Sequence, residues 1–114
     1  MPFLKDSWYC AAWSSDVEDK PVDRKIMGQD IVLFRDSKDK VNAISDKCPH
    51  RFAPLHQGQI IDDAIACPYH GLRFDGTGTC VLNPHGNGQV PPGKHTASFP
   101  IEESNGTIWI WMGD

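Results

Sequence analysis

The stretch CPYHG, residues 67–71, decides how this sequence is interpreted, because it places a cysteine three residues before a histidine. A second stretch, CPHR at residues 48–51, places a cysteine two residues before a histidine. Sixteen residues lie between His50 and Cys67. Each stretch offers one sulfur donor and one nitrogen donor, so the two together predict a metal site with four protein ligands.

The mixed pairing of donors favours a site with two metal ions. A zinc finger usually takes two cysteines from one element and two histidines from the other. Here each stretch can reach both metals, with Cys48 and Cys67 on one iron and His50 and His70 on the other. Sulfur and nitrogen ligation alone also fits a single zinc ion, so a mononuclear zinc module is the alternative at this point.

Length and composition indicate one soluble domain. The chain has 114 residues, 39% hydrophobic and 23% charged, which is enough for a single modest core. A net charge of −4 without any basic stripe argues against nucleic acid as a partner. No export signal or long apolar span is present, so we expect a cytoplasmic protein without a membrane partner. Four cysteines in such a setting favour metal ligands or free thiols over disulfides.

The pattern of the chain predicts an all-β fold. Short runs rich in valine, isoleucine and alanine are bounded by turn residues and predict strands at 30–35, 40–45 and 63–67. The runs 97–103 and 107–112 predict a terminal hairpin, and 14–19 predicts a single helical turn. Prolines, glycines and histidines dominate from about residue 46 to 95. We therefore expect a β scaffold that carries one long functional loop region.

These motifs resemble the Rieske [2Fe–2S] signature, and the similarity extends over nearly the whole chain. It includes SWYCAAW at 7–13, NPHGNG at 83–88 and FPIEESNGTIWIWMGD at 99–114. The sequence is most similar to the N-terminal Rieske domain of aromatic-ring oxygenases of the vanillate O-demethylase-like branch. The resemblance implies that residues 1–114 form a single domain, an antiparallel β-sandwich with a cluster-binding subdomain of two loops. It also implies one Rieske [2Fe–2S] cluster per chain, with the ligands Cys48, His50, Cys67 and His70.

The same resemblance implies a role in electron transfer. In this family a reductase or ferredoxin supplies electrons, and they pass to a mononuclear iron on a larger catalytic domain, in an assembly that is often a trimer. No pattern of two histidines and a carboxylate for such an iron is found here, so we expect the catalytic domain to be absent from these residues and assign no catalytic residue. The alternative is a free-standing Rieske ferredoxin. The stretches 7–13 and 109–114 are more similar to oxygenases than to ferredoxins.

Several other residues have simpler explanations. Cys10 and Cys80 have no partner at ligand spacing, so we expect both to be small buried hydrophobic residues. His56 is expected to lie at the surface or in a local hydrogen bond. Trp109 and Trp111 alternate with apolar residues, which predicts one strand face in the core and another that faces a surface not contained in these residues.

Overall fold

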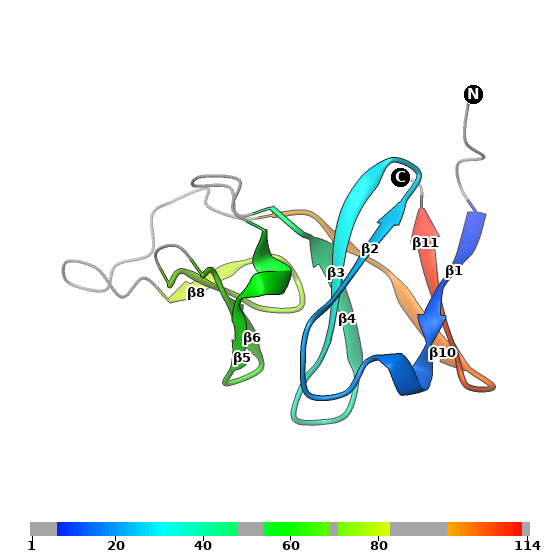
Figure 1. Ribbon diagram of the computed structural model, residues 1–114, viewed down its shortest axis with the longest axis horizontal. Coiled ribbons are helices and arrows are strands. Elements are labelled where there is room, and N and C mark those ends of the chain that lie inside the picture. Colours follow the sequence, from blue (N-terminus) through cyan, green and yellow to red (C-terminus); the bar gives the residue numbers. More distant parts are fainter. Residues whose placement is uncertain (1–6, 48–53, 69–70, 83–95, 113–114) are drawn as a thin grey trace.

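The computed structural model describes residues 7–47, 54–68, 71–82 and 96–112, and these residues form an all-β structure. Within these four ranges, eleven strands and two short 3-10 turns follow one another (Figure 1). Their bounds are β1 Ser7–Trp13, η1 Ser14–Asp16, β2 Val22–Ile26, β3 Gln29–Arg35, β4 Val41–Ser45, η2 Leu55–Gln57, β5 Gln59–Ile61, β6 Ala64–Ala66, β7 Arg73–Phe74, β8 Cys80–Leu82, β9 Ser98–Phe99, β10 Ile101–Ser104 and β11 Thr107–Met112.

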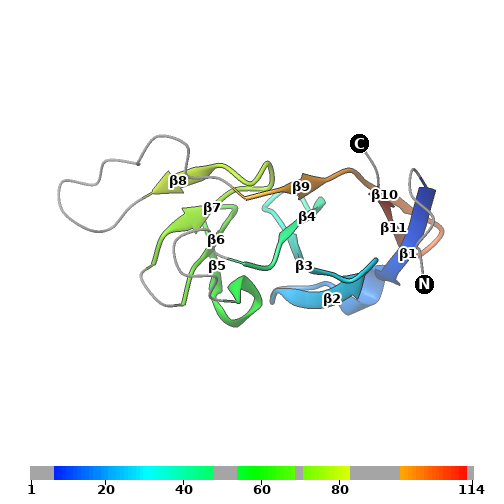
Figure 2. The ribbon, with the colours of Figure 1, turned by 90° about the horizontal axis from the view of Figure 1, so that it is seen from above.

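The strands form three antiparallel sheets. The first sheet has the order β1-β11-β10, the second β2-β3-β4-β9, and the third β5-β6-β7-β8. Figure 2 shows the second sheet between the other two, with the third sheet as a small unit at one end. The expected all-β fold, an antiparallel sandwich with an attached subdomain, is therefore confirmed.

Strand β3 is apolar on both faces because the second sheet is covered on both sides. Ile31 and Leu33 pack in one buried cluster with apolar side chains of β1, β4 and β11. Val32 and Phe34 pack in a second buried cluster with side chains of β6, β7 and β8. All four side chains have no exposed surface. The continuous run Ile-Val-Leu-Phe thus joins the sandwich to the subdomain that holds the candidate site.

The terminal hairpin forms as the sequence predicts. Asn105 and Gly106 connect β10 to β11, and both have positive φ angles, of 53° and 77°. Two such residues make the turn whose twist matches that of the flanking strands. In β11, Ile108, Ile110 and Met112 are buried while Trp109 is exposed, which confirms the alternation.

Pro100 changes the expected strand at 97–103. Strand β9 pairs with β4 in the second sheet, whereas β10 pairs with β11 in the first. A proline has no N–H for a strand ladder, so the run cannot continue as one paired strand through this residue. Its carbonyl accepts a hydrogen bond from the N–H of Trp111 at 3.0 Å. The single strand was therefore a wrong expectation, and the chain passes between sheets at the proline.

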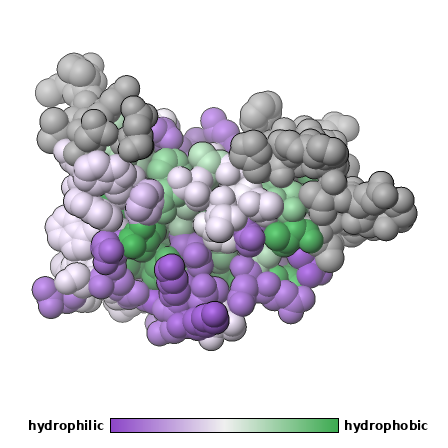
Figure 3. Space-filling model, turned by 180° about the vertical axis from the view of Figure 1, so that it is seen from behind, coloured by the Kyte–Doolittle hydropathy of each residue, from purple (hydrophilic) through white to green (hydrophobic). Residues whose placement is uncertain are grey.

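Polar and charged side chains cover much of the surface. Seen from behind, the hydrophilic residues form a broad band along the lower edge, and apolar atoms show only in separate areas between them (Figure 3). None of the helical segments in the described ranges has the length and apolar character that crossing a membrane requires.

Candidate metal centre

Cys67 is the one predicted ligand that lies within the described residues. Cys48, His50 and His70 lie outside them, so their positions stay predictions. The thiol of Cys67 follows directly after β6, is 3% exposed and takes part in no disulfide.

A tight turn fixes the backbone of Cys67. Its N–H donates to the carbonyl of Leu72 at 2.7 Å, and its carbonyl accepts from the N–H of Gly71 at 2.9 Å. Gly71 has a φ of 77°, a left-handed conformation that glycine adopts without the cost other residues meet. The second predicted loop therefore begins and ends at adjacent points between β6 and β7.

The first predicted loop is also closed at its base. Lys47 and Pro54 form an isolated antiparallel bridge, and the N–H of Leu55 donates to the carbonyl of Asp46 at 3.2 Å. The two ends of segment 48–53, which contains Cys48 and His50, thus lie side by side.

Asp46 and His56 add a polar contact at the same place. The Asp46 carboxylate is 5% exposed and accepts hydrogen bonds from the backbone N–H of His56 at 2.6 Å and from its Nδ1 at 2.5 Å. Burial raises the pKa of the Asp46 carboxyl, and the hydrogen bonds from His56 offset only part of that effect. The local hydrogen bond expected for His56 is confirmed. Its partner was missed, because nothing in the sequence spacing links residues 46 and 56.

The described ends of the loops meet in one region. Leu55, next to the first loop, and Cys67 and Leu72, at the second, belong to the same buried apolar cluster. The Thr96 hydroxyl, which follows the segment 83–95, donates to the carbonyl of Lys47 at 3.4 Å. Described residues that border three separate segments of the chain therefore lie close together, although they are far apart in the sequence.

The donor chemistry of this region fits an iron–sulfur centre. Cysteine thiolates and imidazoles are the ligands of a Rieske centre, and Cys67 supplies a thiol at the anchored base of one loop. Among the residues that the structure describes, no three His, Cys, Asp or Glu side chains gather closely enough to hold a metal ion. The complete ligand set therefore stays a prediction.

Cys80 and Cys10 differ in how far they are buried. Cys80 is 3% exposed and lies in the same apolar cluster as Cys67, so its expected burial is confirmed. Cys10 is exposed, and the expectation that it is buried was wrong. Side chains alternate along β1, and Tyr9 packs against the core, so Cys10 points to the outer face.

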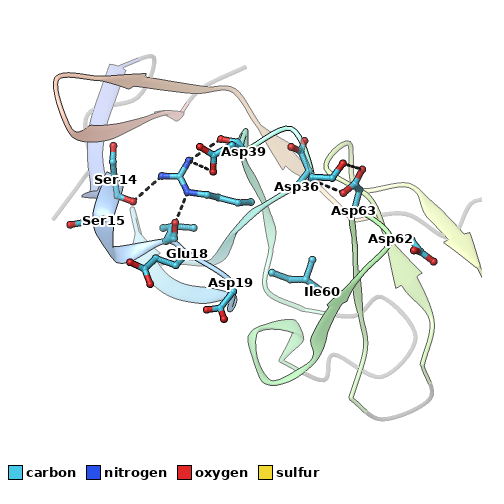
Figure 4. Close-up of a pocket in the computed structure, with 12 residues that line it drawn as sticks. Ser14, Ser15, Glu18, Asp19, Asp36, Asp39, Ile60, Asp62 and Asp63 are labelled. Atoms are coloured by element: carbon cyan, nitrogen blue, oxygen red, sulfur yellow. Dashed lines mark hydrogen bonds and ion pairs between the residues drawn. The ribbon is translucent and has the colours of Figure 1, made fainter.

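An acidic hollow of about 810 Å³ is lined by residues of η1, of the turn after β3 and of the turn between β5 and β6 (Figure 4). Arg35 is the one cationic side chain among its lining residues. Six carboxylates also line it: Glu18, Asp19, Asp36, Asp39, Asp62 and Asp63. Arg35 donates to the carbonyls of Val17 at 2.5 Å and Ser14 at 2.8 Å, and pairs with Glu103 at 2.8 Å. The guanidinium is thus held by structural contacts, and the carboxylates leave the hollow with a net negative charge.

Comparisons with known proteins match the whole described region. A family profile described as the Rieske [2Fe-2S] domain matches residues 7–100. The chain is 52% identical over 112 residues, 98% of its length, to the oxygenase component of chloroacetanilide N-alkylformylase from Rhizorhabdus wittichii. It is 38% identical over 118 aligned positions, 98% of its length, to the vanillate O-demethylase oxygenase subunit of a Pseudomonas species. The crystal structure of dicamba monooxygenase with non-heme iron and dicamba superposes on all of the chain with a TM-score of 0.95 and 46% identity.

The chain spans about a third of the length of each of these proteins. The shares are 32% of the first relative, 31% of the second and 35% of the crystallised chain.

Proposed function

The chain belongs to the Rieske [2Fe-2S] domain family, and on that premise we propose that it is the electron-transfer domain of an oxygenase. In this proposal residues 1–114 form one Rieske domain that works in the cytoplasm. The observation that carries it is the similarity to oxygenase components over nearly the whole chain, together with the buried Cys67 at the anchored base of a loop. A mononuclear zinc module is disfavoured, because the family is that of a [2Fe–2S] domain.

Four residues would hold the cluster in this proposal. Cys48 and Cys67 would bind one iron, and His50 and His70 would bind the other. The group supplies one-electron transfer when it is bound. The described geometry supports the assignment of Cys67, since its thiol is buried and its backbone is fixed on both sides.

The residues around Cys67 keep water away from one side of the site. Leu55, Leu72 and Phe74 pack in the cluster that contains the thiol, and all are at most 5% exposed. A thiolate ligand in an apolar surrounding is shielded from oxidation and from exchange with solvent. Cys67 is therefore held against the apolar core.

The exposed face of the first sheet supports a protein partner. Trp8 and Trp109 are 44% and 38% exposed, and the rings of Trp8 and Trp111 pack edge to face with centroids 5.5 Å apart. Exposed aromatic groups of this size mark interaction surfaces more often than isolated apolar residues do. We assign this face to the catalytic mononuclear-iron domain of a longer oxygenase, which would form a homotrimer. A reductase or ferredoxin would supply the electrons.

A free-standing Rieske ferredoxin is the second candidate, because it would use the same four ligands. The named relatives favour the oxygenase, since their names describe oxygenase components or subunits. The substrate would be an aromatic compound, in line with the names of vanillate O-demethylase and dicamba monooxygenase.

A chimera tests the proposal. This chain would replace the matching first third of the Pseudomonas vanillate O-demethylase oxygenase subunit. The chimera is reduced chemically without oxygen, and oxygen is then admitted with vanillate for a single turnover. We expect demethylated product, and we expect none from the Cys67→Ser chimera or from the isolated chain. A folded chimera with its full iron content that forms no product would contradict the oxygenase role.

A further inference from the structure

Buried polar side chains in the described residues gather at the base of segment 48–53. Asp46 and Thr96 are the two polar residues of the described ranges that are counted as buried, at 5% and 9% exposure. Thr96 donates to the carbonyl of Lys47, and Asp46 accepts two hydrogen bonds from His56. A polar group costs free energy to bury unless it is hydrogen-bonded. Hydrogen bonds therefore offset the free-energy cost of burying both side chains, and both lie beside the first predicted loop.

Asp46 connects the central sheet to the far end of that loop. Its N–H donates to the carbonyl of Asp30 at 2.9 Å, and its carbonyl accepts from the N–H of Leu55 at 3.2 Å. Both carboxylate oxygens accept from His56, in the turn η2 that follows the loop. The side chain thus makes its bonds across the loop ends rather than within a strand ladder.

Closing a loop at its base lowers the entropy that its residues still have to lose. Segment 48–53 has six residues between Lys47 and Pro54, and the bridge between these two residues is one closing contact. The Asp46–His56 pair is a second contact. Asp46 lies one residue before Lys47, and His56 lies two residues after Pro54. Two consecutive contacts fix both the distance and the direction of the loop ends, which is what preorganising a ligand requires.

We propose that Asp46 and His56 are positioning residues for the first ligand loop, so that their hydrogen bonds hold Cys48 and His50 ready for the cluster. This inference rests on the proposed function and its ligand set. Residues that orient ligands from the second layer typically change metal affinity roughly 10- to 100-fold when they are replaced.

Variants of His56 separate the hydrogen bond from the side chain's bulk. His56→Leu removes the Nδ1 donor, whereas His56→Asn places an amide nitrogen at nearly the same point and can still donate to Asp46. Each reconstituted protein is mixed with an iron chelator, and cluster loss is followed by visible absorption. We expect His56→Leu to lose its cluster roughly 10-fold faster than the wild type or more, and His56→Asn to stay within about 3-fold.

A matched control lies elsewhere on the surface. The Asp63 carboxylate accepts from the backbone N–H of Ser37 at 2.6 Å and from its hydroxyl at 2.9 Å, the same two-bond pattern as Asp46 with His56. Asp63 is exposed whereas Asp46 is buried, so Asp63→Asn controls for the loss of the two-bond pattern and not for burial. We expect only Asp46→Asn to speed cluster loss and to alter the electron paramagnetic resonance (EPR) spectrum of the reduced protein. Thermal unfolding without the cluster gives the folding contribution of each.

The outcomes separate the two proposals. If the wild type takes up a cluster while Asp46→Asn and His56→Leu match it in chelator rate and in spectrum, the positioning role is overturned and the proposed function stands. The same conclusion follows if their faster cluster loss only matches that of Asp63→Asn. A wild type that binds no [2Fe–2S] cluster at all would overturn both.

Discussion

Cys67 and Cys80 are equally buried, at 3% exposure, in one apolar cluster, but they differ in their surroundings. Cys67 begins the turn that leads to His70, whereas Cys80 begins a short strand. Burial alone does not make a ligand, and the histidine three residues after Cys67 is what distinguishes the two thiols.

The two cysteines therefore give a direct test of the ligand assignment. We expect Cys67→Ala to prevent stable cluster binding, because a sulfur ligand is lost. Cys80→Ala should keep the cluster and lower the free energy of unfolding by about 1 kcal/mol, as removal of a small buried group does. Iron and acid-labile sulfide per chain measure the difference. Full iron content in Cys67→Ala, or its loss in Cys80→Ala, would contradict the assignment.

Glu103 predicts a pH dependence of stability that is separate from the cluster. Arg35 donates to both of its carboxylate oxygens, at 2.8 and 3.2 Å, and this pairing lowers the pKa of Glu103 below its ordinary value of 4.5. A carboxyl with a lowered folded-state pKa stabilises the fold above its unfolded-state pKa. That contribution is lost as the pH falls through the folded-state value.

Glu103→Gln should thus destabilise the protein at pH 7 and have little effect in strong acid. We expect a loss of up to about 1 kcal/mol, since Glu103 is partly exposed to solvent and screened by it. Urea unfolding at pH 7 and at pH 3 measures both values. The exposed neighbour Glu102, changed to Gln, is the control. Equal losses at the two pH values would rule out the charged pair as the cause.

At the scale of elements, the sequence predicted the strands that follow a simple pattern. The runs 30–35, 40–45 and 63–67 correspond to β3, β4 and β6, because short runs of mostly apolar residues between turns leave few alternatives. Strand β1 was missed because a bulge between Cys10 and Ala12 interrupts its alternation. Strand β2 was missed because three charged residues fill its centre and its side chains are at best half-buried.

The sequence predicts the ligands of the candidate site, of which the structure describes Cys67 alone, but it does not predict the contacts that support the loops. Two short motifs carry the four donors within a few residues of each other, so their spacing predicts a metal site. The contacts of Asp46 with His56, and of Thr96 with Lys47, depend on how three segments are brought together by the second sheet. Such contacts join residues up to 49 positions apart, and no local pattern records them.

Gly78 and Gly106 test how Thr96, which follows the segment 83–95, is anchored. Both have positive φ angles, of 82° and 77°. A Cβ on Gly78 would meet the Thr96 carbonyl oxygen at 2.0 Å, whereas a Cβ on Gly106 would meet nothing within 4 Å. Gly106→Ala should cost about 1–2 kcal/mol for its backbone conformation. Gly78→Ala should cost at least about 1 kcal/mol more, because the backbone at Thr96 must also move.

Chemical denaturation of the two variants gives that difference. The shared φ makes Gly106→Ala the control for conformational cost, so the excess belongs to the contact with Thr96. If both variants lose the same free energy, Thr96 does not pack against Gly78 as described.

At the scale of the whole molecule, the outer face of the first sheet is an exposed aromatic surface within the described residues. Trp8 and Trp109 lie on it, and Tyr9 packs on the opposite, inner face. If this face meets the catalytic domain of an oxygenase, both tryptophans should be protected in the vanillate O-demethylase chimera. Hydroxyl-radical oxidation, read by mass spectrometry, should modify them several-fold less than in the isolated chain.

Tyr9 is the internal reference for that experiment, since its surroundings belong to the domain itself. Its reactivity should be the same in the isolated chain and in the chimera. Unchanged oxidation of Trp8 and Trp109 in an active chimera would show that the catalytic domain contacts another face.

Pulsed EPR of the reduced, reconstituted chain tests the central claim most directly, because it detects the nitrogen atoms bound to the cluster. A [2Fe–2S] centre held by two cysteines and two histidines should give couplings to two ligand nitrogens, together with two irons and two sulfides per chain. His50→Cys and His70→Cys should each remove one of these couplings. A paramagnetic cluster without ligand nitrogen coupling, or a colourless protein that binds zinc in place of iron, would contradict the assignment of Cys48, His50, Cys67 and His70.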